Sequence, residues 1–286
     1  MTVNTHIELL FKETAFKEEI INRLKVVTSG YAERLRFIDE RRKQGDKCSA
    51  SGVLIPLEFA PNLGEWTIIF TKRSDYVQQP GDLCFPGGGM GHKTDRLLRF
   101  LVNRGIVSAW RRSLKRLAGF PTLEKKAISL ILATALRESW EEMRLPPWKV
   151  EFLGSLPAYS LVHFTKSIFP VVGLIKGRWR IKSNWEVEKV IPVPIRSFFD
   201  SANYIRYLLD MPVNPSEIVN SGGYDAPAFV VPDSGDEDIL WGATYSIMMD
   251  FFKLALGIPI SNFQGSRTIE RTLPAHYYTG RARREA

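Results

Sequence analysis

The sequence has few cysteines and histidines: two and four, respectively, among 286 residues. Cys48 and Cys84 give no disulfide framework of the kind that stabilises small secreted domains, and none of these six side chains lies at the close spacing of a zinc site. A metal ion in this protein would therefore be held by carboxylates. The low cysteine content also predicts a reducing, cytoplasmic location.

Long apolar stretches are missing as well. The longest near-apolar run, 127–136, has ten residues and is interrupted by Ser129 and Thr134, whereas a helix that crosses a bilayer needs about 20. The first eight residues lack the basic start and the apolar core of a signal peptide. We therefore expect neither a membrane span nor a secretory leader.

The chain does contain enough apolar material for a core, and its positive charge is unevenly distributed. Hydrophobic residues make up 44% of the chain, which excludes disorder caused by low hydrophobicity. The formal charge of +8 arises within 90–129, where ten cations stand against two anions, Asp95 and Glu124, so that the rest of the chain is formally neutral. The cations are Lys93, Arg96, Arg99, Arg104, Arg111, Arg112, Lys115, Arg116, Lys125 and Lys126.

Hydrophobic periodicity divides the chain into a helical N-terminal extension, 1–47, and a larger domain, 48–286. The extension reads as charged and helical from residue 7 to about residue 42. In the domain, helical patterns occur within the basic segment, at 123–143 and at 241–256, and strand patterns occur at 53–59, 66–71, 150–156, 169–175 and 187–193. This order predicts an α/β fold in which helices cover both faces of a mixed sheet.

Three glutamates fall on one face of the long helix at 123–143. Glu138 lies three positions before Glu141 and four before Glu142, so the three carboxylates project close together and repel one another. Mg²⁺ or Mn²⁺, which take oxygen ligands and commonly also bind substrate phosphates, would offset this repulsion. The alternative is a solvated acidic face that is balanced by Arg137 and Arg144.

A glycine-rich loop, Phe85-Pro86-Gly87-Gly88-Gly89, precedes this helix, and its backbone can approach a metal ion or a phosphate closely because no Cβ intervenes. Together, the loop and the segment Arg137-Glu138-Ser139-Trp140-Glu141-Glu142 resemble the Nudix hydrolase box, G-x₅-E-x₇-R-E-U-x-E-E-x-G-U, in which U is aliphatic. Leu145 stands at the last aliphatic position. The resemblance implies the α/β/α sandwich of that family, with a mixed β-sheet, and here a helical insertion of about 90–129 inside the box.

Other short motifs resemble the coenzyme A diphosphatase branch of the Nudix family. They follow the expected order over roughly 53–256: Thr71-Lys72-Arg73-Ser74, Gly81, Phe85-Pro86-Gly87-Gly88, Thr134-Ala135-Leu136-Arg137-Glu138, Phe169-Pro170-Val171-Val172-Gly173, Glu186-Val187 and Trp241-Gly242-Ala243-Thr244.

The chain departs from the family pattern in several places. About 35 additional residues, which include the basic segment, separate Gly88 from Arg137. Ser129 stands at the position of the first box glutamate, which in the family supports the arginine more than it binds metal. Arg144 replaces the box glycine, and 77–79 lacks the arginine of the coenzyme A signature.

The resemblance implies hydrolysis of a nucleoside diphosphate linked to another group, with Mg²⁺ or Mn²⁺ as cofactor. The implied metal ligands are Glu138, Glu141, Glu142 and the carbonyl of Gly88. Catalysis is assigned to Glu138, Glu141 and Arg137, with the arginine orienting the glutamates by ion pairing. Either Glu138 or a metal-bound hydroxide accepts the proton of the attacking water.

Three further residues are implied to lie around the substrate. Lys72 and Arg73 would hold its phosphates, and Glu186 would lie beside the site. Each also fits an ordinary surface charge.

The leading hypothesis is hydrolysis of coenzyme A or acyl-CoA to adenosine 3′,5′-bisphosphate and a 4′-phosphopantetheine derivative. One alternative is a Nudix hydrolase for ADP-ribose or NADH, and another is a Nudix-like regulatory module that binds polyanions through the basic segment. The expected partner is thus a small nucleoside diphosphate, nucleic acid is not expected, and a homodimer stays open.

The basic segment itself permits two interpretations. Inserted between the two halves of the box, it would form a helical flap or rim over the phosphates of the substrate. Alternatively, the stripe of Ile106, Trp110 and Leu114 packs on the core or on a partner subunit, and the cations are merely solvated.

Overall fold

The computed structural model describes residues 8, 10–161, 166–210, 223–235, 237–258 and 267–281. Its helices are α2 (Glu13–Leu24), α3 (Tyr31–Lys43), α4 (Lys93–Arg104), α5 (Ser108–Leu117), α6 (Thr122–Met143) and α7 (Gly242–Phe251), with short 3₁₀ turns η1 (Pro147–Lys149), η2 (Ile195–Phe199) and η3 (Ser201–Asn203) and a π-helical turn η4 (Phe252–Leu256). Its strands are β1 (Ser49–Ala60), β2 (Glu65–Arg73), β3 (Leu83–Cys84), β4 (Gly87–Gly89), β5 (Val150–Ser155), β6 (Tyr159–Leu161), β7 (Lys166–Ile175), β8 (Val187–Pro194), β9 (Tyr204–Asp210), β10 (Tyr224–Val230), β11 (Ile239–Leu240) and β12 (Arg267–Thr272).

A mixed sheet of eight strands forms the centre of the molecule, as the strand pattern predicts. Its main path runs β3-β2-β1-β7-β5, and β4, β6 and β8 pair with β1, β7 and β2, respectively. The pair β1·β7 is parallel, and the other pairs in this sheet are antiparallel. The hairpin β1-β2 places the glycine-rich loop, which follows β2 and β3, back against β1.

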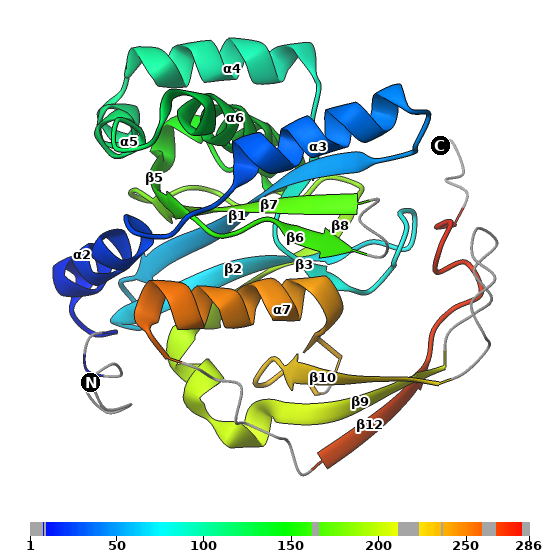
Figure 1. Ribbon diagram of the computed structural model, residues 1–286. Helices are drawn as coiled ribbons and strands as arrows, with labels where there is room; N and C mark the ends of the chain where they lie inside the picture. Colours follow the sequence, from blue (N-terminus) through cyan, green and yellow to red (C-terminus); the bar gives the residue numbers. More distant parts are fainter. Residues whose placement is uncertain are drawn as a thin grey trace.

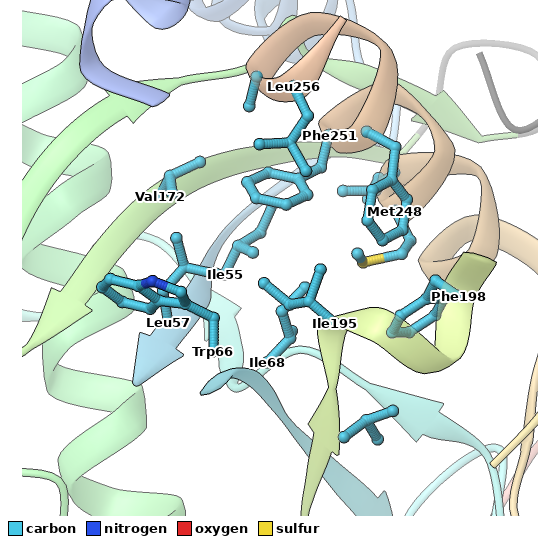
Figure 2. Packing of buried hydrophobic residues seen from close by; sticks show 14 of the residues in the cluster. Ile55, Leu57, Trp66, Ile68, Val172, Ile195, Phe198, Met248, Phe251 and Leu256 are labelled. Carbon is cyan, nitrogen blue, oxygen red and sulfur yellow. The ribbon is translucent and has the colours of Figure 1, made fainter. Parts of the chain in front are cut away.

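Helices cover both faces of this sheet. Neighbouring residues of a strand point to opposite sides, so each strand contributes to both of the buried clusters. Leu54 and Ile69 pack with α3, α5 and α6, whereas Ile55 and Ile68 pack with α2, α7 and η4. Figure 2 shows the second of these clusters, to which Met248 of α7 and the strand residues Ile55 and Ile68 all belong. The prediction of a mixed sheet between helical layers is therefore confirmed.

A second, four-stranded sheet lies beyond α7, and the sequence patterns do not predict it. Its order is β11-β10-β9-β12, and β12 runs parallel to β9. Helix α7 lies between the two sheets (Figure 1). Phe198 of η2 stacks on Phe229 of β10 with 4.2 Å between ring centroids, which joins the second sheet to the core.

In its described residues, the N-terminal extension contains the helices α2 and α3, in agreement with its helical pattern. Gly30 adopts a left-handed conformation (φ 67°) between α2 and α3. Glu124, at the start of α6, accepts hydrogen bonds from the Ser29 hydroxyl and from the backbone N–H groups of Tyr31 and Ala32. These bonds satisfy the first free N–H groups of α3. The side chain of Glu124, which is remote in sequence, thus caps the start of α3 and stabilises the turn between α2 and α3.

The basic insertion forms α4 and α5, which pack against α6 and β5 in the layer above the sheet (Figure 1). Val102, Trp110 and Leu117 are buried in the core cluster, and the indole N–H of Trp110 donates to the carbonyl of Pro147 over 3.0 Å. The insertion is thus an integral part of one helical layer.

In the described part of the chain, no helix combines the length and the apolarity that crossing a bilayer requires.

Candidate active site

The last turns of α6 carry the acidic cluster. The helix ends at Met143, where Arg144 takes a left-handed conformation (φ 59°) and the two prolines that follow cannot continue the helix. The family pattern has a glycine at Arg144, and the backbone keeps the conformation that a glycine would favour. The Arg144 guanidinium lies over the ring of Trp140, 5.4 Å from its centroid.

The glycine-rich loop presses its backbone against α6. Strand β4 pairs with β1, with Gly88 opposite Gly52, and a Cβ at Gly88 would collide with the carboxylate of Glu138. A Cβ at Gly52 would lie 2.9 Å from the carbonyl oxygen of Ile131 in α6. Glycine at both positions therefore brings the carbonyls of the loop next to the acidic end of the helix.

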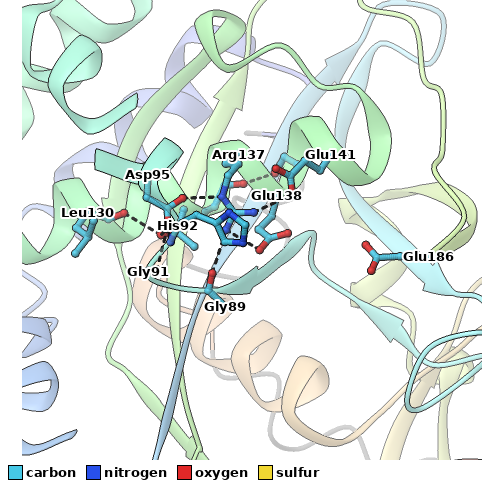
Figure 3. A network of polar contacts seen from close by, with 12 residues as sticks. Gly89, Gly91, His92, Asp95, Leu130, Arg137, Glu138, Glu141 and Glu186 are labelled. Atoms are coloured by element: carbon cyan, nitrogen blue, oxygen red, sulfur yellow. Dashed lines mark hydrogen bonds and ion pairs between the residues drawn. The ribbon is translucent and has the colours of Figure 1, made fainter. Parts of the chain in front are cut away.

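Arg137 is the centre of a polar network at this end of α6 (Figure 3). Its side chain is 6% exposed and pairs with Glu138, with Glu141 and with Asp95 over 2.8, 2.8 and 2.7 Å, while it also donates to the carbonyl of Gly89. Burial alone would lower the pKa of Arg137, but the Asp95 hydrogen bond and the neighbouring carboxylates raise it above its ordinary value. The arginine thus forms ion pairs with two of the three glutamates of the cluster.

Asp95 is the part of this network that the sequence analysis missed. It lies in the first turn of α4, is fully buried, and accepts hydrogen bonds from Arg137, from the Thr134 hydroxyl and from the backbone N–H groups of Gly91 and His92. The Ser129 hydroxyl donates within its own helix, to the carbonyl of Lys126. The insertion therefore supplies a carboxylate to Arg137, the support that Ser129 does not give.

The three glutamates differ in their surroundings. The side chains of Glu138 and Glu141 are 14% and 46% exposed and face Arg137, whereas Glu142 is buried. Burial, followed by the nearby charge of Glu138, raises the pKa of Glu142 to about 8, although the Gly87 backbone N–H partly opposes this. Burial also raises the pKa of Glu138.

A hard divalent cation fits this donor set. One buried oxygen of Glu142 has no hydrogen-bond partner. The other oxygen ligands nearby are carboxylates and the carbonyls of a loop in which a Cβ at Gly88 would displace the carboxylate of Glu138. As the side chains lie, no three Asp, Glu, His or Cys groups in the described residues converge closely enough to enclose an ion. Glu138 and Glu141 would have to turn from Arg137 toward a common point.

A cavity of about 680 Å³ opens beside the acidic cluster. Five of the residues predicted from the sequence share its neighbourhood: Glu138, Glu142, Gly88, Arg73 and Glu186 all line it, and Glu186 faces the glutamates of α6 from across the site (Figure 3). Its far wall comes from β6, β10 and the start of α7, and includes Tyr159, Tyr224 and Trp241. The cavity thus has a charged end at the glutamates and an aromatic end at the second sheet.

Glu141, Arg137 and Lys72 are not among the described residues that line the cavity. Arg137 and Glu141 lie directly behind it, in contact with Glu138 or its network. Lys72 instead points to β8 and β11, where its ammonium pairs with Asp238 over 3.2 Å and with Glu188 over 3.5 Å. These ion pairs hold the Lys72 ammonium away from the described lining of the cavity.

The structure does not place the basic insertion over the cavity. No described residue of 90–129 lines the cavity. Arg112 and Arg116 instead pair with Glu151, a fully buried carboxylate of β5, over 2.5 and 2.7 Å. These cations hold α5 on the sheet because a buried carboxylate needs compensating charge.

Asp82 anchors the rim of the cavity opposite the glutamates. Its carboxylate accepts hydrogen bonds from the Trp241 indole over 3.0 Å and from the Tyr277 hydroxyl over 2.6 Å. Burial raises the pKa of Asp82 to about 6, although both hydrogen bonds and Arg73 oppose the shift. The backbone N–H of Gln79 donates to the carbonyl of Tyr277, so the segment after β12 fixes the loop that lines the cavity.

Comparison with known proteins identifies relatives by sequence. The chain is 31% identical over 163 residues to the uncharacterized Nudix hydrolase NudL of Pectobacterium atrosepticum, covering 56% of this chain and 64% of that protein. It is 27% identical over 157 residues to NudL of Salmonella paratyphi B, covering 54% and 62%. The chain therefore spans less than two thirds of the length of these relatives. No protein-family model matches it.

Solved structures of Nudix proteins resemble the chain more loosely. A MutT/nudix family protein from Enterococcus faecalis aligns with a TM-score of 0.38 at 13% identity, over 82% of this chain and 89% of its own. An Ap4A hydrolase from C. elegans aligns with a TM-score of 0.33 at 12% identity, over 52% and 81%. By sequence, the chain is thus similar to curated Nudix hydrolases over about half of its length.

Proposed function

We propose that this chain is a Nudix hydrolase that depends on Mg²⁺ or Mn²⁺ and cleaves the pyrophosphate bond of coenzyme A or acyl-CoA. Water adds to one phosphorus and the bridging P–O bond breaks, which yields adenosine 3′,5′-bisphosphate and a 4′-phosphopantetheine derivative. The observation that carries the proposal is the cavity of about 680 Å³ that joins the glutamates of α6 to an aromatic wall. The sequence motifs, which follow the order seen in the coenzyme A branch of the Nudix family, favour this substrate.

Each end of the cavity suits one part of such a substrate. A divalent cation held by Glu138, Glu141, Glu142 and the Gly88 carbonyl would neutralise the diphosphate and lower the pKa of the attacking water. Arg73 lines the same end, and its Nε–H donates to the carbonyl of Gln78 over 2.6 Å, so its guanidinium is fixed beside the position of the phosphates.

Arg137 and Glu138 divide the remaining work. Arg137 is always protonated and cannot act as a base, so it orients Glu138 and Glu141 through its ion pairs. Burial raises the pKa of Glu138, and a carboxylate with a raised pKa accepts a proton from water more readily. At the other end, Tyr224 and Trp241 offer ring faces to the base of the nucleotide.

A substrate panel tests the proposal. The purified chain is incubated with Mn²⁺ and coenzyme A, acetyl-CoA, ADP-ribose or NADH, and the products are separated by chromatography. We expect the highest kcat/KM for coenzyme A or its acyl derivative. Glu141→Gln should lose turnover, whereas Glu40→Gln, an exposed control on α3, should keep the turnover of the wild type. Preferred cleavage of ADP-ribose or NADH would reject the coenzyme A assignment, and no turnover of any compound would reject the hydrolase.

A further inference from the structure

Helix α4 turns one face to solvent, and this face is both basic and apolar. Positions 93, 96, 97, 100 and 104 recur at spacings of three and four residues, and all are exposed. The opposite face, with Asp95, Leu98 and Val102, packs into the body of the protein. We define the outer face of α4 as the exposed basic and apolar residues of the helix and the turn after it: Lys93, Arg96, Leu97, Phe100, Arg104 and Ile106.

Large apolar side chains on this face are unusually exposed. Leu97, Phe100 and Ile106 are 58%, 51% and 58% exposed. Arg104 lies over the ring of Phe100, 4.4 Å from its centroid, so cation and ring share one surface. Single exposed apolar residues are ordinary, but three within ten positions indicate a surface that contacts another phase or molecule.

The exposed charges of α4 and α5 have one sign. Asp95 is the single acidic residue of α4 and α5, and it is fully buried against Arg137. Arg111 and Lys115 of α5 are exposed as well. The surface of both helices therefore presents cations without exposed anions, and the partner that complements it is anionic.

We propose that the outer face of α4 docks on a membrane surface that contains anionic phospholipids. Leu97 and Phe100 would enter the boundary between headgroups and acyl chains while the flanking cations contact phosphates, as in amphipathic helices that lie in a membrane interface. A nucleic-acid backbone also attracts cations, but it offers no apolar layer for these two side chains. The outermost position of α4 leaves this face accessible (Figure 1).

Sedimentation with vesicles tests the proposal on the full chain. We expect the protein to pellet with vesicles of phosphatidylcholine and phosphatidylserine, and not with phosphatidylcholine alone. Arg96→Ser/Arg104→Ser should weaken partitioning about 25-fold, since each cation contributes about fivefold. Leu97→Ser/Phe100→Ser should weaken it about tenfold or more. All four side chains are exposed, so the variants should keep the melting temperature of the wild type.

Controls separate this docking from catalysis and from general stickiness. Arg36→Ser and Leu63→Ser, which alter an exposed cation on α3 and an exposed leucine in the β1–β2 turn, should bind like the wild type. Glu141→Gln should also bind normally, because docking does not depend on the active site.

Several outcomes would overturn the proposal. These are no binding of the wild type to anionic vesicles, or equal binding by the α4 variants. Binding that duplex DNA displaces, and that Leu97→Ser/Phe100→Ser leaves unchanged, would assign the face to nucleic acid. A dimer that dissociates in the same variant, without vesicle binding by the wild type, would assign it to a second copy of the chain.

Discussion

Replacing Asp95 with asparagine removes the negative charge that faces Arg137 and keeps the size and one acceptor oxygen of the side chain. Asp95 is fully buried and Arg137 is 6% exposed, so the lost charge lies in a poorly solvated place. Breaking a buried ion pair from one side costs about 3–5 kcal/mol. Because Arg137 keeps Glu138 and Glu141, we expect the free energy of unfolding to fall by about 2–3 kcal/mol.

The same substitution should also affect turnover. Groups that orient a functional residue without touching substrate are worth about 10–100-fold, so we expect kcat to fall by that factor with KM nearly unchanged. The Mn²⁺ concentration for half-maximal activity should rise, because an arginine released from Asp95 pairs more closely with Glu138 and Glu141. The assays are urea unfolding and steady-state kinetics with Mn²⁺ titration, and Asp75→Asn, an exposed ion-pair partner, is the control.

Wild-type kcat and Mn²⁺ dependence in folded Asp95→Asn would refute the positioning role, even if the protein were less stable.

Three further predictions concern the stability of the fold. Arg116→Met should lower the free energy of unfolding by about 2–4 kcal/mol without raising KM, because it removes a cation from buried Glu151. Arg111→Met, the control, should change the free energy of unfolding by less than about 0.5 kcal/mol. A raised KM of Arg116→Met at unchanged stability in urea would contradict this structural role. Arg144→Gly should stabilise the protein by about 1 kcal/mol and so raise its thermal midpoint, because the backbone at this position has φ of 59°, which glycine adopts more readily than arginine. An unchanged thermal midpoint would contradict this. For Asp82, the pKa raised from 3.8 to about 6 means that the folded protein binds the proton more tightly; this stabilisation is complete below about pH 4 and is lost as the pH rises through about 6. Between about pH 4 and pH 7, the free energy of unfolding of Asp82→Asn should therefore rise relative to that of the wild type by on the order of 1–3 kcal/mol. A difference in urea unfolding that stays constant with pH would disprove the raised pKa.

Much of the central sheet and of α6 could be predicted because its signals are local. The predicted helix at 123–143 is observed as Thr122–Met143, since a continuous helical pattern is followed by two prolines that stop it. The strand runs were recognised because apolar side chains fill both faces of a buried sheet. The spacing of Glu138, Glu141 and Glu142 likewise follows from one helix.

The second sheet is not predicted because β10 and β12, the strands on either side of β9, lack those signals. Strand β10 contains Asp225 and Pro227, which are unfavourable in strands, and β12, Arg267–Thr272, is polar and largely exposed. Both are strands because β9 offers them an edge on either side. That information lies in the tertiary fold.

The buried ion pairs beside the site could not be predicted from local sequence patterns either. Asp95 precedes Arg137 by 42 residues, and nothing near either residue indicates that they meet. One signal was available: Asp95 is an isolated acid in a segment of cations, and such a residue at the start of a helix suits a buried N-terminal turn. Arg112 and Arg116 read as solvated cations because Glu151, their buried partner, sits in a strand almost 40 positions away.

The most direct test of the account measures release of adenosine 3′,5′-bisphosphate from coenzyme A as Mn²⁺ is added. We predict turnover that requires the metal in the wild type and in Glu40→Gln, and a fall in kcat/KM of about 100-fold or more in Glu142→Gln, whose buried carboxylate faces the cavity. Release of the bisphosphate without added metal after treatment with a chelator, or wild-type activity in Glu142→Gln, would contradict the proposed site.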